Sequence, residues 1–206
     1  MVYRTTPKMA KRKEAHRGKF LQTAIRLFGS QGFHATTVPN IVHQSESSTG
    51  AFYFYFRNKE HVFSAALEFI GEQVSTAVNQ AISSAGEDTI SQMRAAVVAL
   101  IVYLAEHPDE ARVLIVESSG MTPQVARVRR NIIASHSRSV QQGLAKISGS
   151  LPRLDPHVVA SCWVGAVHEA VYQWLQTPKS QRANAETLAR QVCSFNLRGI
   201  GVRLEE

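Results

Sequence analysis

The chain has 206 residues, of which 44% are hydrophobic and 19% are charged, and its formal net charge is +7. This length allows one or two domains with a sizeable core, and the absence of a run of about 18 apolar residues excludes a predicted membrane span. The basic N-terminus lacks the apolar stretch of a secretory signal, and Cys162 and Cys193 are too few for a disulfide scaffold. We therefore expect a cytoplasmic protein whose two cysteines are small buried side chains, with a redox switch as the alternative.

The excess charge lies at one end of the chain. Residues 1–60 hold ten Lys or Arg against three acidic residues, which is the whole excess of +7, whereas residues 61–206 hold thirteen of each sign. Charge confined in this way indicates a polyanionic partner for the N-terminal segment. Residues 1–10 show no periodicity and are expected to form a disordered basic arm, which either contacts that partner or is a solvated tail.

Three helices are predicted in the first part of the chain. The first spans residues 11–30, with apolar side chains at helical spacing, and Gly32 follows it as a stop signal. Thr37 can cap a second helix, because its hydroxyl accepts an amide that the first turn leaves unpaired, and Pro39 suits that turn. Ser48 can cap a third helix. Two short helices joined by a tight turn are typical of a helix-turn-helix that lies in a DNA groove, with a surface hairpin around aromatic residues as the alternative.

An ordered set of residues runs through this segment. It comprises Ala24, Leu27, Phe28, Gly32, Phe33, Thr36, Thr37, Val38, Ile41, Ser48, Gly50, Phe52, Tyr53, Tyr55, Phe56, Asn58, Lys59 and Glu60. With this set, the stretch from Lys13 to Phe63 resembles the DNA-binding domain of the tetracycline-repressor (TetR) family of bacterial regulators. The resemblance implies that Thr37, Tyr53 and Lys59 reach DNA phosphates. It also implies that residues around Thr49, Gly50 and Tyr55 face the groove. Ser48, which begins the same helix, is a further predicted DNA-binding residue.

The turn between the two short helices departs from the family pattern. The family usually has Ala-Gly-Val where this chain has Ser45, Glu46 and Ser47. Glycine adopts a positive φ at little cost, whereas Glu46 in that conformation is strained, and Ser47 replaces an apolar side chain. We expect either a turn of different shape or a less stable domain, but no loss of DNA binding.

The remainder of the chain is also predicted to be helical, which makes the fold all-α with about nine helices. Asn58 can cap a long fourth helix over 59–84 that begins beside the DNA and links the two domains. The further helices are predicted at 89–106, 109–118, 124–147, 156–176 and 183–200. The expected domains are a helix-turn-helix domain at 11–63 and a ligand-binding and dimerisation domain at 64–206.

The helix predicted at 156–176 is apolar nearly all round, so it must be covered on two sides. Ser161 and Gly165 allow close backbone approach on it. The simplest cover is a second copy that forms a two-fold four-helix bundle, which the family resemblance favours, and burial within one subunit is the alternative. The predicted dimer interface comprises Ser161, Gly165, Leu188, Val192 and Phe195.

The resemblance also implies an inducer pocket in the second domain, for an unknown hydrophobic or amphipathic molecule. The candidates are polar or aromatic residues isolated on apolar helices: Tyr103, Arg112, Glu117, His136, Trp163, His168, Glu169 and Tyr172. Trp163 and Tyr172 are favoured, because aromatic walls with a polar tip suit small-molecule sites. Arg112 and Glu117 could instead be solvated or paired, and His136 could lie on a polar face.

The sequence therefore predicts a ligand-responsive transcriptional regulator, as a repressor that a small molecule releases from a palindromic operator. The alternatives are an activator and a ligand-independent DNA-binding protein. An enzyme is not expected, because the chain has no supported catalytic triad and no Gly-rich phosphate loop, and its eight histidines show no paired metal-ligand spacing. The expected partners are double-stranded operator DNA, a second copy of the chain and a small-molecule effector, with no cofactor, no metal and no membrane.

Overall fold

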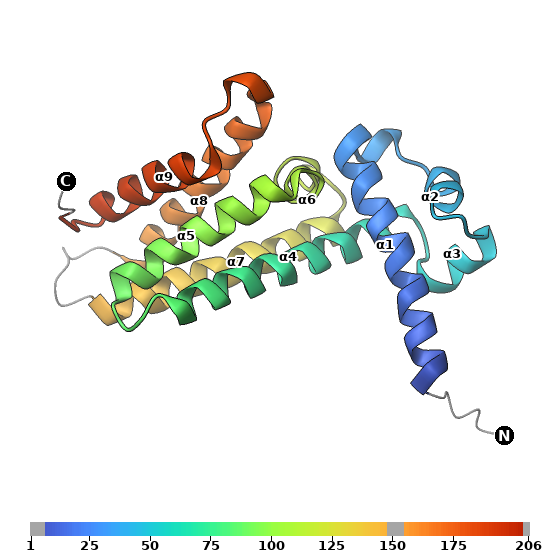
Figure 1. The fold of residues 1–206 in the computed structure, drawn as a ribbon, viewed down its shortest axis with the longest axis horizontal. Coiled ribbons are helices and arrows are strands. Elements are labelled where there is room, and N and C mark those ends of the chain that lie inside the picture. The colour runs from blue at the N-terminus through green and yellow to red at the C-terminus, as the bar shows by residue number, and fades with distance from the viewer. Residues whose placement is uncertain (1–6, 148–154, 204–206) are drawn as a thin grey trace.

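The computed structural model describes residues 7–147 and 155–203, and that part of the chain is helical with no strand (Figure 1). Its elements are α1 (Pro7–Ala35), α2 (Val38–Gln44), α3 (Thr49–Tyr55), α4 (Lys59–Ser84), α5 (Thr89–Glu106), α6 (Pro108–Ala111), the π-helical turn η1 (Arg112–Glu117), α7 (Pro123–Ile147), α8 (Pro156–Gln176), the 3-10 turn η3 (Lys179–Gln181) and α9 (Ala185–Gly199). The all-α prediction is confirmed.

The helices form two groups that α4 connects. Figure 1 shows α1, α2 and α3 together at one end of the molecule, and α4, α5, α7, α8 and α9 along the rest of it. Helix α4 contacts α1 at its start and then packs along α5 and α7. The predicted link from the helix-turn-helix to the second group therefore exists as one continuous helix.

The three predicted caps of the N-terminal group are confirmed. The Thr37 hydroxyl accepts the Asn40 amide at 3.3 Å, and the Asn40 side chain accepts the Thr37 amide in return. The Ser48 hydroxyl accepts the Ala51 amide, and the Asn58 side chain accepts the His61 amide at 2.8 Å. These local bonds fix where α2, α3 and α4 begin.

Helix α1 is longer than predicted. It begins at Pro7, so residues 7–10 are helical rather than part of an arm, and residues 1–6 of the predicted arm lie outside the described residues. The predicted stop at Gly32 is a backbone break with φ +85°, after which the segment continues to Ala35. A positive φ is inexpensive only for glycine, so this residue allows the change of direction.

The end of α1 is fastened to the second group of helices. A Cβ atom on Gly29 would lie 2.5 Å from the Cα of Asp109, so only glycine allows α1 to approach α6 this closely. Arg112 Nε donates to the Gly29 carbonyl at 2.9 Å, and the Phe33 amide donates to Glu117 Oε2 at 2.9 Å. Turn η1 thus holds the last turns of α1 through two polar contacts.

Helix α5 is the one described helix that is long and apolar enough to cross a membrane by length and composition. It packs against α4 and α9, and the side chains of Met93, Val97 and Leu100 line an internal cavity. A core helix beside a cavity passes the same hydropathy test, so this finding is weak evidence for a membrane span.

Candidate functional site

One side of α3 is open to solvent. Thr49 and Gly50 are exposed, as are Tyr53 at 54% and Phe54 at 66%, whereas Phe52 is fully buried. Because successive residues of a helix are 100° apart, the four exposed residues cover one continuous side of α3. A Cβ on Gly50 would meet nothing within 4 Å, so the backbone there is accessible. This side of α3 is the candidate DNA-reading surface.

Tyr55 does not belong to the exposed side, although the family resemblance implied that it faces the groove. Its half-buried ring lies edge-on to His16, with centroids 5.7 Å apart, and 6.1 Å from the Phe20 ring. It therefore packs α3 against α1. Phe54, which the sequence analysis missed, takes the exposed place, and its position four residues after Gly50 is the signal that could have identified it.

Basic side chains flank this surface. The Lys13 ammonium lies 4.6 Å from the centroid of the Phe54 ring, and the Arg17 guanidinium lies 5.5 Å from that of Phe56. Lys11, Arg12 and Arg57 are exposed. The contacts with aromatic rings hold part of the segregated positive charge of the chain beside α3.

Lys59 occupies a different place from the predicted phosphate contact. Its ammonium donates to the carbonyls of Phe33 and Thr36, each at 2.8 Å, and to that of His34 at 3.5 Å. It also lies 4.1 Å from the centroid of the Phe33 ring. An ammonium has three donors, and here all three have carbonyl partners. The side chain therefore fastens the start of α4 to the end of α1 instead of extending into solvent.

The turn between α2 and α3 has the strained residue that the sequence analysis considered. Glu46 is the one non-glycine residue with a positive φ, +48°, in the described part of the chain. Its carboxylate accepts a hydrogen bond from Lys19 at 3.0 Å, which lowers the pKa of Glu46, and Ser47 Oγ lies 3.1 Å from His16 Nε2. Two side chains of α1 thus bind the polar turn that replaces the usual Ala-Gly-Val.

Replacing Glu46 with glycine should raise the midpoint of thermal unfolding by roughly 2–4 °C, because glycine adopts this φ without strain. The exposed pair with Lys19 contributes little, since solvent screens it. Glu46→Gln is the matched control, because it removes the charge and keeps the strained backbone, and it should leave the midpoint nearly unchanged. An unchanged midpoint for Glu46→Gly would mean that the turn relaxes without strain.

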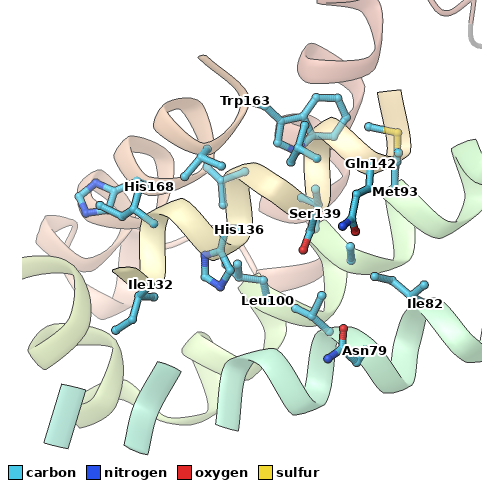
Figure 2. Close-up of a pocket in the computed structure, with 18 of the residues that line it drawn as sticks. Asn79, Ile82, Met93, Leu100, Ile132, His136, Ser139, Gln142, Trp163 and His168 are labelled. Atoms are coloured by element: carbon cyan, nitrogen blue, oxygen red, sulfur yellow. The ribbon is translucent and has the colours of Figure 1, made fainter. Parts of the chain in front are cut away.

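A cavity of about 330 Å³ lies among the helices of the second group (Figure 2). Helices α4, α5, α7 and α8 and turn η1 contribute its walls, which are mostly aliphatic. Figure 2 shows Leu100, Ile132 and Trp163 around it, together with the polar side chains of His136, Ser139 and Asn79. Mainly apolar walls with a few polar groups are typical of small-molecule sites of this size.

The two histidines of the cavity are held in their neutral form. Burial lowers the pKa of His136, and burial together with the charge of Arg129 lowers the pKa of His168, against a smaller opposing effect of Glu169. Arg129 lies 3.1 Å from His168 Nε2 through one terminal nitrogen. Arginine can only donate, so His168 Nε2 accepts, and the proton of the neutral ring is on Nδ1.

Three of the residues predicted to bind a ligand, His136, Trp163 and His168, line this cavity. The others have different surroundings. Tyr103 donates to Glu110 Oε2 at 2.6 Å and stacks on His107, and burial and Glu110 raise the pKa of Tyr103. The remaining four predicted residues, Arg112, Glu117, Glu169 and Tyr172, do not line the cavity.

Two of these four, Arg112 and Glu117, are absent from the cavity wall because their side chains bind backbone groups at the end of α1. Arg129, a polar residue of the cavity wall, was not among the predicted ligand-binding residues. It precedes Ile132, Ile133 and His136 at spacings of three, four and seven residues on α7. That helical spacing is the signal that places these side chains on one face.

The outer side of α8 and α9 carries small and apolar residues without cover in the protomer. Val158 is 58% exposed and Phe195 is 70% exposed. Ser161, Gly165 and Cys162 are exposed on the same side of α8, so the expectation of a buried Cys162 is wrong, whereas Cys193 is buried as predicted. Large exposed apolar side chains beside small residues mark an interaction surface.

Val192 is a correction to the predicted dimer interface. Its side chain is buried within the protomer on α9, which packs against α5 and α8, and Leu188 beside it is half-buried. These residues contribute to the core of one subunit. Of the predicted set, only Ser161, Gly165 and Phe195 are exposed and available to a second copy.

The N-terminal segment matches a known family. A sequence model described as "Bacterial regulatory proteins, tetR family" matches residues 20–66. The chain is 26% identical over 145 residues to the uncharacterized HTH-type transcriptional regulator YuxN of Bacillus subtilis, which is 70% of this chain and 49% of that protein. It is 30% identical over 115 residues to the HTH-type transcriptional activator FasR of Mycolicibacterium smegmatis, covering 55% and 52% of the two chains. The aligned part thus spans about half the length of these relatives.

The whole fold also has counterparts among solved structures. The crystal structure of the transcriptional regulator FadR from Bacillus subtilis, in complex with stearoyl-CoA, superimposes with a TM-score of 0.77 over 89% of this chain and 98% of that chain. At 19% identity this likeness concerns the fold alone. Together with the match over residues 20–66, the similar regulators confirm the resemblance seen in the sequence. Over residues 20–66 the chain matches the TetR family of bacterial regulatory proteins, and its whole fold is similar to that of the regulator FadR.

Proposed function

We propose that this protein is a ligand-responsive transcriptional regulator of the cytoplasm, which binds a palindromic operator as a homodimer and leaves it when a small molecule enters the cavity. The observation that supports this most is the combination, in one chain, of an exposed α3 beside basic residues and an apolar cavity in the second group of helices. FadR, the fold relative described with stearoyl-CoA, supports an effector site in this fold. The similarity to FasR, named as an activator, makes activation the alternative to repression.

In the proposed complex, α3 enters the major groove with its exposed side toward the bases. Thr49 and Gly50 allow close approach, and Tyr53 and Phe54 offer ring edges to the thymine methyl groups. Lys13 and the neighbouring cations of α1 meet the phosphates. The predicted contacts of Thr37 and Ser48 fit as hydroxyls exposed at the rim of the same surface.

The effector signal has a short route from the cavity to the DNA-binding surface. Leu114 and Ile115 line the cavity, while Arg112 and Glu117 on the same turn η1 hold the end of α1. A ligand that displaces η1 would therefore move α1, in addition to the displacement that α4 transmits. π-Helical turns are rare, and they occur frequently at functional sites.

A small displacement is sufficient for release in this arrangement. The two reading helices of a dimer must be about 34–36 Å apart to enter successive major grooves. A ligand that weakens operator binding about 100-fold must bind the DNA-free shape about 2.7 kcal/mol more tightly than the DNA-bound shape.

The test is a selection of bound duplexes from a random DNA pool, followed by gel shifts on the enriched sequence. Tyr53→Ala should weaken binding roughly tenfold or more on that sequence, because its exposed ring contacts the groove or its edge. Tyr53→Phe keeps the ring and measures the hydroxyl alone. Gln80→Ala, at an exposed position on α4, is the control for unrelated surface changes. A pool without enrichment, or wild-type affinity for Tyr53→Ala, would contradict the proposed reading surface.

A further inference from the structure

The charged residues of the cavity wall have one sign. Arg129 and Lys146 line it, and none of the lining residues in the described part of the chain is an aspartate or a glutamate. Both cations come from α7, whose 25 residues include five Lys or Arg and no acidic residue. Aligned positive charge without acidic partners gives a wall of positive potential, which favours an anion inside.

Arg129 has unused hydrogen-bonding capacity. One terminal nitrogen donates to His168, while its Nε is enclosed and has no hydrogen-bond partner among the described residues. No salt bridge involves this side chain within residues 7–147 and 155–203. A guanidinium remains charged at any physiological pH, and an enclosed charge without a counterion is unfavourable. The remaining N–H donors of Arg129 can therefore bind an anionic group.

A second enclosed polar atom without a hydrogen-bond partner lies two helical turns along the same face of α7, within the part of the chain that the structure describes. His136 Nε2 is buried and has no hydrogen-bond partner in the part of the chain that the structure describes. The ring is neutral, since burial lowers the pKa of His136, so Nε2 can donate or accept according to its tautomer. Figure 2 shows the ring between the aliphatic side chains of Ile132 and Leu100, where it faces the cavity.

The cavity is elongated and opens away from the DNA-binding end. Arg129 and Lys146 are seventeen positions apart on α7, which corresponds to about 25 Å of helix at 1.5 Å per residue. Lys146, Gln142 and Asn79 at one end are exposed, whereas the lining residues near Arg129 are buried or half-buried. Aliphatic side chains such as Val97 and Val140 lie between the two ends.

We infer that the effector is an amphipathic organic anion: an extended apolar chain with a carboxylate, which Arg129 binds at the enclosed end of the cavity. The planar guanidinium can form two parallel bonds to a carboxylate, and His136 can bind a further polar atom of the ligand. The apolar chain then lies against Leu100 and Trp163 and points toward the open end. This inference rests on the proposed function, because it names the ligand class of the proposed effector site.

The experiment compares three probes of equal chain length on the purified full-length protein, by isothermal titration calorimetry without DNA. The probes are dodecanoate, dodecan-1-ol and dodecylamine. Dodecanoate should bind at least roughly tenfold more tightly than the alcohol, because hydrogen bonds to charged groups are the stronger ones, and the protonated amine should bind most weakly. Equal affinity for the acid and the alcohol, or no binding of any probe, would overturn the inference.

The variants locate the anion. Arg129→Met should abolish the preference for the acid and leave the affinity for the alcohol unchanged. Arg127→Met removes an exposed arginine of the same helix and should have no effect. If Lys146→Met removes the preference and Arg129→Met does not, the charge lies at the open end and the inferred placement is wrong. Ligand-free Arg129→Met should unfold at the same temperature as the wild type or above it, since an unpaired charge is removed.

The outcomes separate this inference from the proposed regulation. Calorimetry reports the ligand class even if the DNA selection yields no operator, in which case the regulatory function fails and the inference stands. If dodecanoate shows no preference while the selected operator is bound through α3, the regulator remains and the ligand class is wrong. The salt dependence of operator binding should not change in Arg129→Met, because this residue lies in the cavity and not beside α3.

Discussion

Gly165→Glu is expected to convert the protein into monomers and to lower its operator affinity by at least roughly 1,000-fold, toward non-specific binding. A Cβ atom on Gly165 would meet nothing within 4 Å in the protomer, and the position is exposed, so we expect the subunit itself to tolerate the change. In the proposed dimer, the new carboxylate would be buried against the partner without a counterion. A monomer can contact only one half-site of the operator, whereas a dimer holds two reading helices at the spacing of both half-sites.

Light scattering after size-exclusion chromatography measures the mass of the variant, and gel shifts on the selected operator measure its affinity. Circular dichroism verifies that the helical content is unchanged. Ser180→Glu, at an exposed position between α8 and α9, introduces the same charge away from the proposed interface and should remain dimeric. A soluble Gly165→Glu dimer would mean that another surface joins the subunits. Val192 is unsuitable for this test, because it is buried in the protomer.

Lys59→Met is expected to lower the free energy of unfolding by about 3 kcal/mol, because carbonyl groups lose a charged donor and the Phe33 ring loses a cation above it. Methionine keeps much of the apolar stem, so the loss is mainly polar. Urea unfolding monitored by circular dichroism measures the change. Lys13→Met, at an exposed lysine of α1, is the matched control and should alter stability by less than about 0.5 kcal/mol.

The same two variants distinguish the internal role of Lys59 from the phosphate contact that the family resemblance implied. Where both are folded, Lys13→Met should reduce the salt dependence of operator binding by about one unit, whereas Lys59→Met should leave it unchanged. A reduced slope for Lys59→Met would mean that the ammonium leaves the carbonyls of α1 in the complex and reaches the DNA.

Helix boundaries could be predicted from the sequence because they depend on neighbouring residues. The predicted ranges 59–84, 89–106 and 156–176 agree with α4, α5 and α8. Each of these helices has a capping residue directly before its first residue. The side chains of Asp88 and Asp155 accept backbone amides in the first turns of α5 and α8. The segregated charge and the motif from Ala24 to Glu60 are likewise properties of the sequence alone, and the motif carries the resemblance to the TetR family.

The partners of individual side chains could not be predicted in the same way. Lys59 was expected at the DNA, yet its carbonyl partners lie more than twenty residues earlier in the chain. Arg112 and Glu117 were expected to bind a ligand, because they are polar residues on apolar helices. Their partners are instead backbone groups of α1 more than eighty residues away. Sequence spacing does not reveal such distant acceptors, so only the packing of α1 on η1 assigns these residues.

The tertiary structure also decided which side of an all-round apolar helix is buried in the protomer. The sequence indicated that α8 and α9 need cover, but not which side faces the protomer core. The packing of α9 on α5 buries Val192 and leaves Phe195 in solvent. The sequence by itself thus determined the resemblance to the TetR family, the helices and the location of the positive charge, because these depend on residue type and local spacing. The tertiary structure decided the donor–acceptor pairs and the inner and outer faces, because those depend on which distant segments meet.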